Sequence, residues 1–294
     1  MTKYKDLCAA VTARIVADIE AGASAKDWRM PWHRRAADGS VLAPINASTG
    51  DFYQGGNIWA LAFAAEELET ETHTWATYNQ WQKMGYQVAR GQKATKCVYW
   101  LRVKDKKDET KTRLIPNVFS VHNACQLTEE FKPDEVETPE LWDGSLPLRT
   151  AERLIDASGA DIRFGGSRAF YSLSGDYVGL PNRQDFISRS TFYSTAFHEL
   201  GHWTGHASRL DRTIGGSFGS AKYAAEELVA ELASATLCAQ LGVDAEPRKD
   251  HAQYVKSWLK VLNDDPANIM RAQSFASKAV SFLTDKADGE QLAA

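Results

Sequence analysis

The chain has 294 residues, of which 44% are hydrophobic and 24% are charged, and its formal net charge is −4. This composition is typical of a folded globular protein with one large or two ordinary domains, and it excludes a disordered chain. No run approaches the roughly 18 apolar residues of a membrane-spanning helix, and the N-terminus lacks the apolar core of a secretory signal. We therefore expect a cytoplasmic protein with no membrane partner.

Charge and cysteine placement refine this picture. Residues 1–125 carry 17 Lys and Arg against 13 Asp and Glu, a balance of +4 that leaves −8 for the remainder. A basic front and an acidic back indicate two modules with different partners. The cysteines show no Cys-x-x-Cys spacing, which indicates buried thiols in a reducing compartment. They are Cys8, Cys97, Cys125 and Cys238.

Apolar spacing predicts helices and a hairpin in the first part of the chain. A helix with apolar positions every three to four residues spans 7–21 and stops at a glycine. Two further helices are expected at 58–68 and 75–84, the second with Thr74 or Thr77 as its N-cap. A strand, a charged hairpin loop and a returning strand are expected at 87–103, 104–111 and 114–122.

Residues 129–148 hold three prolines among acidic side chains, and this change in composition predicts a linker. We therefore place the domains at 1–128 and 149–294. In the second domain the pattern predicts one helix, three short strands and four more helices, at 149–158, 162–164, 169–173, 176–180, 191–204, 223–241, 251–262 and 269–283. This order predicts an α+β fold whose helices come last.

The strongest chemical signal is His-Glu-Leu-Gly-His at 198–202, the His-Glu-x-x-His pattern of zinc peptidases. Positions i and i+4 share one helix face, so the imidazoles of His198 and His202 can reach one ion. Glu199 follows the first histidine and can act as the general base toward the attacking water. A surface helix with two histidines is the simpler alternative, but the small and apolar neighbours of this segment indicate a buried helix.

A catalytic zinc site needs a third protein ligand, and His206 is a poor candidate for it. On a continuous helix His206 lies about 12 Å along the axis from His198, too far to share the same ion unless the chain breaks at Gly205. The extended metzincin pattern also fails, because Ser208 stands where that pattern needs a histidine.

The better source is the acidic run at 226–231 on the next helix. Glu227 and Glu231 share a face, so Glu227 can bind the metal while Glu231 accepts the N–H of a ligand histidine. Glu226 remains the alternative ligand. The simpler reading is a set of solvated carboxylates near the helix N-terminus, and it fits Glu231 poorly because that residue lies mid-helix among apolar side chains.

This layout is similar to that of gluzincin-like peptidases: a strand, a His-Glu-x-x-His helix, a loop and a glutamate helix. In such enzymes the strand before the helix can pair with a peptide substrate, and residues 176–180 would be that strand. A group that polarises the tetrahedral intermediate is also expected, with His251 and Tyr254 as candidates from spacing alone. Zinc is the first choice of ion, and manganese can also occupy a site of two histidines and a carboxylate.

In the first domain, aromatic residues alternate with cations. Rings on which bases stack, with Lys and Arg along the phosphates, form the usual platform for a nucleic-acid single strand. The simpler alternative is that most of these rings are core residues. The candidate DNA-contacting residues are Tyr53, Asn57, Trp59, Trp75, Trp81, Arg90, Lys93, Lys96 and Trp100.

Several motifs occur together in an order that resembles one family. They are Gly55-Gly-Asn-Ile-Trp59, Trp75-Ala-Thr-Tyr-Asn-Gln-Trp81, Val88-x-x-Gly91-x-Lys93 and Phe119-Ser-Val-His-Asn123-Ala-Cys-Gln126, followed by the histidine and glutamate motifs above. Over nearly its whole length the chain resembles the ArdC antirestriction proteins of conjugative plasmids. The resemblance implies an N-terminal domain that binds single-stranded DNA and a C-terminal zincin-like metallopeptidase domain. It also implies metal binding by His198, His202 and the Glu227 region, and a catalytic Glu199.

The expected function is therefore protection of incoming conjugative plasmid DNA from the recipient's restriction enzymes. The expected partners are single-stranded DNA and a protein substrate in the recipient cell. Two alternatives stay open. One is a protection protein that only binds single-stranded DNA and whose metal site is structural or unused. The other is a regulatory metallopeptidase with no DNA role.

Overall fold

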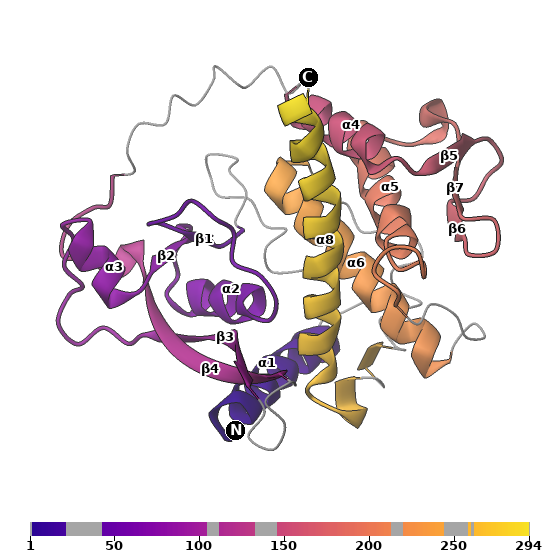
Figure 1. Cartoon of the computed structure of the whole chain (residues 1–294). Helices are drawn as coiled ribbons and strands as arrows, with labels where there is room; N and C mark the ends of the chain where they lie inside the picture. The colour runs from indigo at the N-terminus through magenta and orange to yellow at the C-terminus, as the bar shows by residue number, and fades with distance from the viewer. Residues whose placement is uncertain are drawn as a thin grey trace.

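The structure is a computed structural model that describes residues 2–21, 43–104, 112–132, 146–212, 220–243, 258–259 and 262–293. Its front part contains α1 (Thr2–Ala21), β1 (Ile45–Asn46), α2 (Asn57–Glu67), β2 (Thr74–Ala76), α3 (Tyr78–Lys83), β3 (Thr95–Lys104) and β4 (Thr112–Asn123). Its back part contains α4 (Leu146–Ser158), β5 (Asp161–Phe164), β6 (Phe170–Ser172), β7 (Tyr177–Leu180), α5 (Arg189–Trp203), α6 (Ala221–Leu241) and α8 (Asn268–Ala293). Figure 1 shows the long α8 between the front elements and the α5–α6 pair.

The front part is built on a four-stranded sheet with the order β1-β2-β4-β3. Strands β3 and β4 form a long antiparallel ribbon, in register from Thr95 opposite Val121 to Lys104 opposite Thr112. Helix α2 is buried on two sides because its residues belong to two separate apolar clusters. It therefore connects the front sheet to the rest of the molecule.

The back part combines a three-stranded sheet, in the order β5-β7-β6, with the helices α4, α5, α6 and α8. Helices α5 and α6 approach closely at Gly201, where a Cβ atom would lie 3.1 Å from the Cα of Ala230. A larger residue at this position would push the two helices apart. This close approach brings the histidine motif of α5 against the glutamates of α6.

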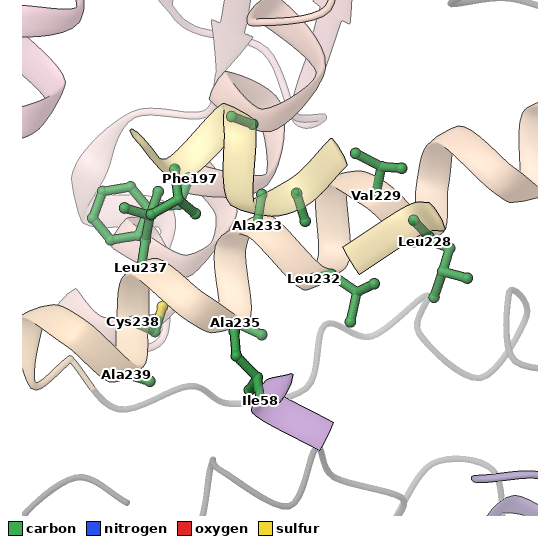
Figure 2. Close-up of a cluster of buried hydrophobic side chains, with 14 of the residues drawn as sticks. Ile58, Phe197, Leu228, Val229, Leu232, Ala233, Ala235, Leu237, Cys238 and Ala239 are labelled. Atoms are coloured by element: carbon green, nitrogen blue, oxygen red, sulfur yellow. The ribbon is translucent and has the colours of Figure 1, made fainter. Parts of the chain in front are cut away.

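The front and back parts share their largest hydrophobic core within the described residues. Apolar side chains of α1 and α2 belong to the same cluster as those of α4, α5, α6 and α8. Figure 2 shows Ile58 of α2 against the apolar face of α6. Two hydrogen bonds connect the front part to α8. The indole N–H of Trp59 donates to Gln273 (3.1 Å), and the Gly55 N–H donates to Ser277 (2.9 Å). The two sequence-defined modules are thus packed together through a continuous apolar interface.

The structure corrects the predicted start of the helix at 75–84. Residues Thr74–Ala76 form β2, which pairs with both β1 and β4, and the side chains of Trp75 and Ala76 are fully buried. The helix begins only at Tyr78, where Thr77 and Gln80 form a reciprocal capping box. The apolar spacing was compatible with a helix, but pairing in the middle of a sheet outweighed it. The short strand β1 was not predicted either.

Other predicted elements agree with the structure or lie outside the described residues. Helices α1, α2, α4, α5, α6 and α8 and strands β3 to β7 overlap their predicted ranges. The largest differences are the start of β3, at Thr95 instead of residue 87, and the end of α8, at Ala293 instead of residue 283. The predicted charged loop, the centre of the predicted linker and most of the predicted helix at 251–262 fall outside the described ranges. Cys125 is exposed, so the expectation of four buried thiols is wrong for that residue. None of the helices in the described part of the chain has the length and hydropathy needed to cross a bilayer.

Candidate metal centre

Helix α5 carries the histidine motif in a fully packed environment. The helix starts after Ser188, whose hydroxyl accepts a hydrogen bond from the Thr191 N–H (3.1 Å). From Phe192 to Trp203 its side chains are buried, which is unusual for a helix with two imidazoles and a carboxylate. The rings of His198 and His202 lie 4.9 Å apart, as expected for positions one turn apart on one face.

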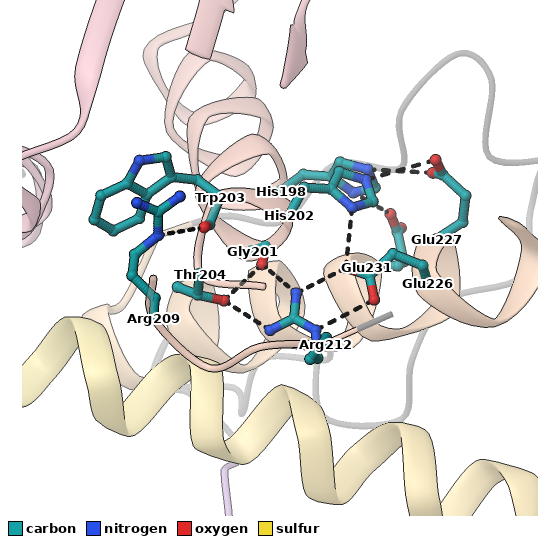
Figure 3. A network of polar contacts seen from close by, with 10 residues as sticks. All are labelled: His198, Gly201, His202, Trp203, Thr204, Arg209, Arg212, Glu226, Glu227 and Glu231. Atoms are coloured by element: carbon teal, nitrogen blue, oxygen red, sulfur yellow. Dashed lines mark hydrogen bonds and ion pairs between the residues drawn. The ribbon is translucent and has the colours of Figure 1, made fainter. Parts of the chain in front are cut away.

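Helix α6 brings a carboxylate to both imidazoles. It begins after the N-cap Ser220 and ends at Gly242, whose φ of 67° provides the left-handed C-cap. The two oxygens of Glu227 lie 3.4 Å from Nε2 of His198 and 3.5 Å from Nε2 of His202. All three side chains are buried and point toward one another in Figure 3. The structure thus brings together the three residues predicted as metal ligands.

Two further glutamates contact the opposite ring nitrogens. Glu231 lies 3.2 Å from Nδ1 of His198, and Glu226 lies 3.3 Å from Nδ1 of His202. Each imidazole therefore has one carboxylate at Nδ1 and shares Glu227 at Nε2. A carboxylate at Nδ1 fixes the ring orientation and the tautomer that leaves the Nε2 lone pair free. Glu226, the alternative third ligand in the sequence, is on the Nδ1 side, away from the shared point.

Arg212 completes this arrangement and was not predicted. Its side chain is 4% exposed, and its guanidinium donates to both oxygens of Glu226 (2.7 and 3.2 Å). It also donates to the carbonyl of Gly201 (2.6 Å) and to the hydroxyl of Thr204 (2.9 Å), at the end of α5 (Figure 3). Arg212 follows the α5 turn in an irregular segment, where no periodic pattern indicates a role. It ties the end of α5 to the first turns of α6 and neutralises the carboxylate beside His202.

The electrostatics of the cluster favour a bound positive charge. Burial alone lowers the pKa of His202, but the carboxylates of Glu226 and Glu227 outweigh that effect and raise this pKa to about 10. Burial raises the pKa of Glu227, but hydrogen bonds to His198 and His202 hold it well below its usual range. The carboxylates therefore stay ionised and attract positive charge, which either protons or a metal cation can supply.

The geometry of the three ligands fits a divalent ion. Nitrogen and oxygen donors about 2.0–2.1 Å from one tetrahedral ion are roughly 3.4 Å from one another. The two nitrogen–oxygen separations, each to a different oxygen of Glu227, are 3.4 and 3.5 Å. With one ligand atom taken from each residue, the three atoms lie within 4.8 Å of one another. Three protein ligands of the types histidine, histidine and glutamate leave a fourth position open, as in catalytic zinc sites.

The other predicted site residues occupy different positions. Glu199 is buried on α5 beside this cluster, and its charge contributes to the raised pKa of His202. His206 is not part of the ligand cluster, and its Nδ1 lies 2.8 Å from the hydroxyl of Ser208 in the turn after α5. His251 and Tyr254 lie outside the described residues.

The predicted substrate-pairing strand is wrong. Residues 177–180 form β7, which is the central strand of its sheet. It pairs with β5 along one edge and with β6 along the other, so its backbone groups are already used. Strand order depends on long-range packing, and the local pattern at 176–180 could not reveal it.

Comparisons with known proteins match both halves of the chain. Residues 149–275 match the model of a zincin-like metallopeptidase, and residues 5–138 match that of the N-terminal domain of anti-restriction factor ArdC. The metal-free crystal structure of antirestriction protein ArdC from plasmid R388 is 36% identical, with a TM-score of 0.74, over 97% of this chain and 98% of that chain. The chain belongs to the ArdC antirestriction family. The Mn(II)-bound structure of the same R388 protein is 34% identical, with a TM-score of 0.74, over 95% and 97% of the two chains.

Two further relatives of this ArdC-family chain are a protein of similar length and part of a larger protein. The uncharacterised protein y4eC of Sinorhizobium fredii (strain NBRC 101917 / NGR234) is 38% identical over 95% of this chain and 91% of its own length. A DNA primase TraC of Escherichia coli is 38% identical over 93% of this chain, and this match covers only 26% of the primase. The ArdC-family chain therefore corresponds to about a quarter of that larger protein.

Three of the predicted DNA contacts in the ArdC N-terminal domain are core residues. Trp59, Trp75 and Trp81 are 0% exposed. A ring with no exposed face cannot stack on a base, so the prediction is wrong for these three. The alternation of rings and cations in the sequence did not distinguish buried rings, on α2, β2 and α3, from exposed ones.

The remaining candidates divide into structural and exposed residues. Tyr53 is half-buried and its hydroxyl contacts Asn46 (3.3 Å), while both ends of the Asn57 amide bond the backbone of Val98 (2.7 and 2.8 Å). These two side chains mainly hold the front domain together. The exposed candidates are Arg90, Lys93, Lys96 and Trp100, with Trp100 48% exposed.

Proposed function

We propose that this chain is an antirestriction protein that binds single-stranded DNA and hydrolyses a peptide bond with a divalent metal held by His198, His202 and Glu227. The observation that carries the proposal is the buried trio itself, in a zincin-like domain joined to an ArdC N-terminal domain. In this proposal the protein acts in the cytoplasm of the recipient cell, where incoming plasmid DNA meets restriction enzymes. Zinc is the proposed ion, and manganese fits the same ligands.

The catalytic roles follow from where the side chains lie. A divalent ion held by His198, His202 and Glu227 would supply Lewis acidity toward a peptide carbonyl and toward the attacking water. Glu199 takes the proton of the attacking water and delivers it to the departing amine, which requires one carboxylate close to both. Burial of Glu199 keeps competing water away from this exchange. Glu226 and Glu231 hold the two imidazoles in the orientation in which Nε2 faces Glu227.

Support for DNA binding comes from the front domain. Exposed cations and the exposed ring of Trp100 lie on the front sheet and its loops. Aromatic rings supply stacking surfaces and cations neutralise phosphates, and neither requires a base sequence. A protein that protects any incoming single strand must bind DNA of any base sequence.

A transfer experiment tests the proposal. A conjugative plasmid that encodes this chain is transferred into restricting and non-restricting recipients. The number of transconjugants in restricting recipients, divided by the number in non-restricting recipients, is measured for the wild type and for Glu199→Ala. We expect the wild type to raise the ratio and Glu199→Ala to lose that gain while it still shifts labelled single-stranded DNA.

Two results would contradict parts of the proposal. Full protection by Glu199→Ala would assign the function to DNA binding alone and make the metal site structural or unused. Absence of any salt-dependent binding of single strands by the wild type would favour a regulatory metallopeptidase with no DNA role.

A further inference from the structure

A groove of ≈ 970 Å³ lies between the front and back parts of the protein. One wall is formed by the β3–β4 ribbon and by the turn before α2. The other wall is formed by α8, which Figure 1 shows beside the ribbon. Leu210, from the turn after α5, also lines the groove, two residues before the Arg212 that supports His202 through Glu226. The groove is separate from the metal ligands, and none of its described features is used by the proposed hydrolysis.

Exposed aromatic rings line both walls of the groove. Trp100 is 48% exposed on β3, next to the exposed Tyr99, and Phe275 is 43% exposed on α8. The ring of Tyr4 packs edge-on against Trp100 with centroids 5.2 Å apart, which fixes the indole and leaves about half of it uncovered. Rigid rings that face an open groove from two sides are suited to stacking against flat groups.

Cations accompany these rings on both walls. Arg102 and Lys104 share the strand face of Trp100, because alternate residues of a strand point the same way, and both are exposed. On α8, the ammonium of Lys278 lies 5.5 Å from the centre of the Phe275 ring. Among the groove-lining residues Asp285 is an acid, and Asp265 partly neutralises Arg271 (2.6 Å). The cations that remain beside the rings are Lys278 in the lining and, farther along β3 beyond the lining residues, Arg102 and Lys104.

We propose that this groove is the path of the single strand, with bases stacked on Trp100 and Phe275 and phosphates next to Lys278, Arg102 and Lys104. The inference rests on the proposed function, and it adds that the strand is bound between the two domains and not on the front domain alone. An apolar groove could also accept an extended peptide. The pairing of each ring with a cation favours nucleic acid, because a peptide backbone has no regular negative charge for those cations to neutralise.

The test uses the full chain and fluorescently labelled oligo(dT), with dissociation constants measured by anisotropy at several salt concentrations. We expect Trp100→Ala and Phe275→Ala each to weaken binding about 5- to 100-fold, the usual range for loss of one base–aromatic stack. Trp100→Phe keeps a ring and should restore most of the affinity. Lys278→Ala should lower the slope of log affinity against log salt by about 0.7.

A matched control and a mapping experiment make the test specific. Phe170→Ala removes an equally exposed ring (43%) from β6, on the far side of α5, and should leave binding unchanged. Oligo(dT) that contains 5-iodouracil, photo-crosslinked to the wild type, should label peptides that include Trp100 and Phe275. Far-ultraviolet circular dichroism checks that each variant is folded.

The outcomes separate this inference from the proposed function. A wild type that does not bind oligo(dT) would overturn both. A wild type that binds, with Trp100→Ala and Phe275→Ala within about twofold of it, would overturn the groove alone. Weaker oligo(dT) binding by Trp100→Ala but not by Phe275→Ala would also overturn it, because α8 would then not contact the strand. If Trp100→Ala and Phe275→Ala bind oligo(dT) as the wild type does but no longer bind an unfolded polypeptide, the groove is a peptide-binding site.

Discussion

Replacing Glu199 by glutamine is expected to reduce peptide hydrolysis about 10²- to 10⁴-fold, the usual contribution of a general base. Glutamine has nearly the same shape as glutamate, but its amide cannot accept the proton of the attacking water. The buried environment of Glu199 offers no room for bulk water to take over that task. The rate is measured on the metal-loaded full chain with a library of quenched fluorescent peptides.

Two controls accompany this variant. Metal affinity should stay unchanged in Glu199→Gln, because Glu199 is not among the ligand atoms that converge on one point. Glu67→Gln removes an exposed carboxylate on α2 and should leave the rate unchanged. Equal hydrolysis rates for Glu199→Gln and the wild type would remove Glu199 from the catalytic role.

Truncation of Arg212 to alanine is expected to cost about 3–5 kcal/mol of unfolding free energy, as for other buried ion pairs that lose one partner. Glu226 would remain buried without its guanidinium partner, and the carbonyl of Gly201 would keep the Thr204 hydroxyl as its side-chain donor but lose Arg212. Metal affinity should fall as well, about 10- to 100-fold, because Glu226 would no longer be held against Nδ1 of His202. Urea-induced unfolding and metal titration measure the two effects.

Matched variants show whether the buried charge is the cause. Arg271→Ala breaks an exposed ion pair with Asp265 and should cost no more than about 1 kcal/mol. The double variant Arg212→Met with Glu226→Gln removes both charges and should recover part of the lost stability. A single Arg212→Ala variant as stable as the wild type would contradict the assigned network.

The metal site was largely readable from the sequence because helical periodicity decides it. The spacing of His198 and His202 fixes them on one face, and the apolar neighbours of Glu227 and Glu231 indicate a second buried helix. Arg212 could not be found in this way. It lies in an irregular segment, and only the packing of α5 against α6 brings it to Glu226. Long-range ion pairs of this kind leave no local pattern.

The front domain and the substrate strand show where the sequence was misleading. Trp59, Trp75 and Trp81 have the composition of a stacking platform, but all three rings are buried, on α2, β2 and α3. Trp59 is buried in the core shared by the two parts, whereas Trp75 and Trp81 are buried in two smaller clusters of the front part. The shared core was not predicted, because the apolar face of an amphipathic helix such as α1 does not show which element packs against it. Likewise, the pattern at 176–180 predicts a strand but not its place in the middle of a sheet.

Metal titration of the full chain tests the central claim, which is that His198, His202 and Glu227 hold one divalent ion. Calorimetry with Zn²⁺ and Mn²⁺, together with elemental analysis, gives stoichiometry and affinity for the wild type, Glu227→Gln and Glu231→Gln. We expect one ion per chain in the wild type and one ion bound about 10- to 100-fold more weakly in Glu231→Gln, whose lost carboxylate only orients His198. Glu227→Gln should lose more affinity than Glu231→Gln does. A Glu227→Gln variant that binds the ion as tightly as the wild type would contradict the assignment of Glu227 as a metal ligand.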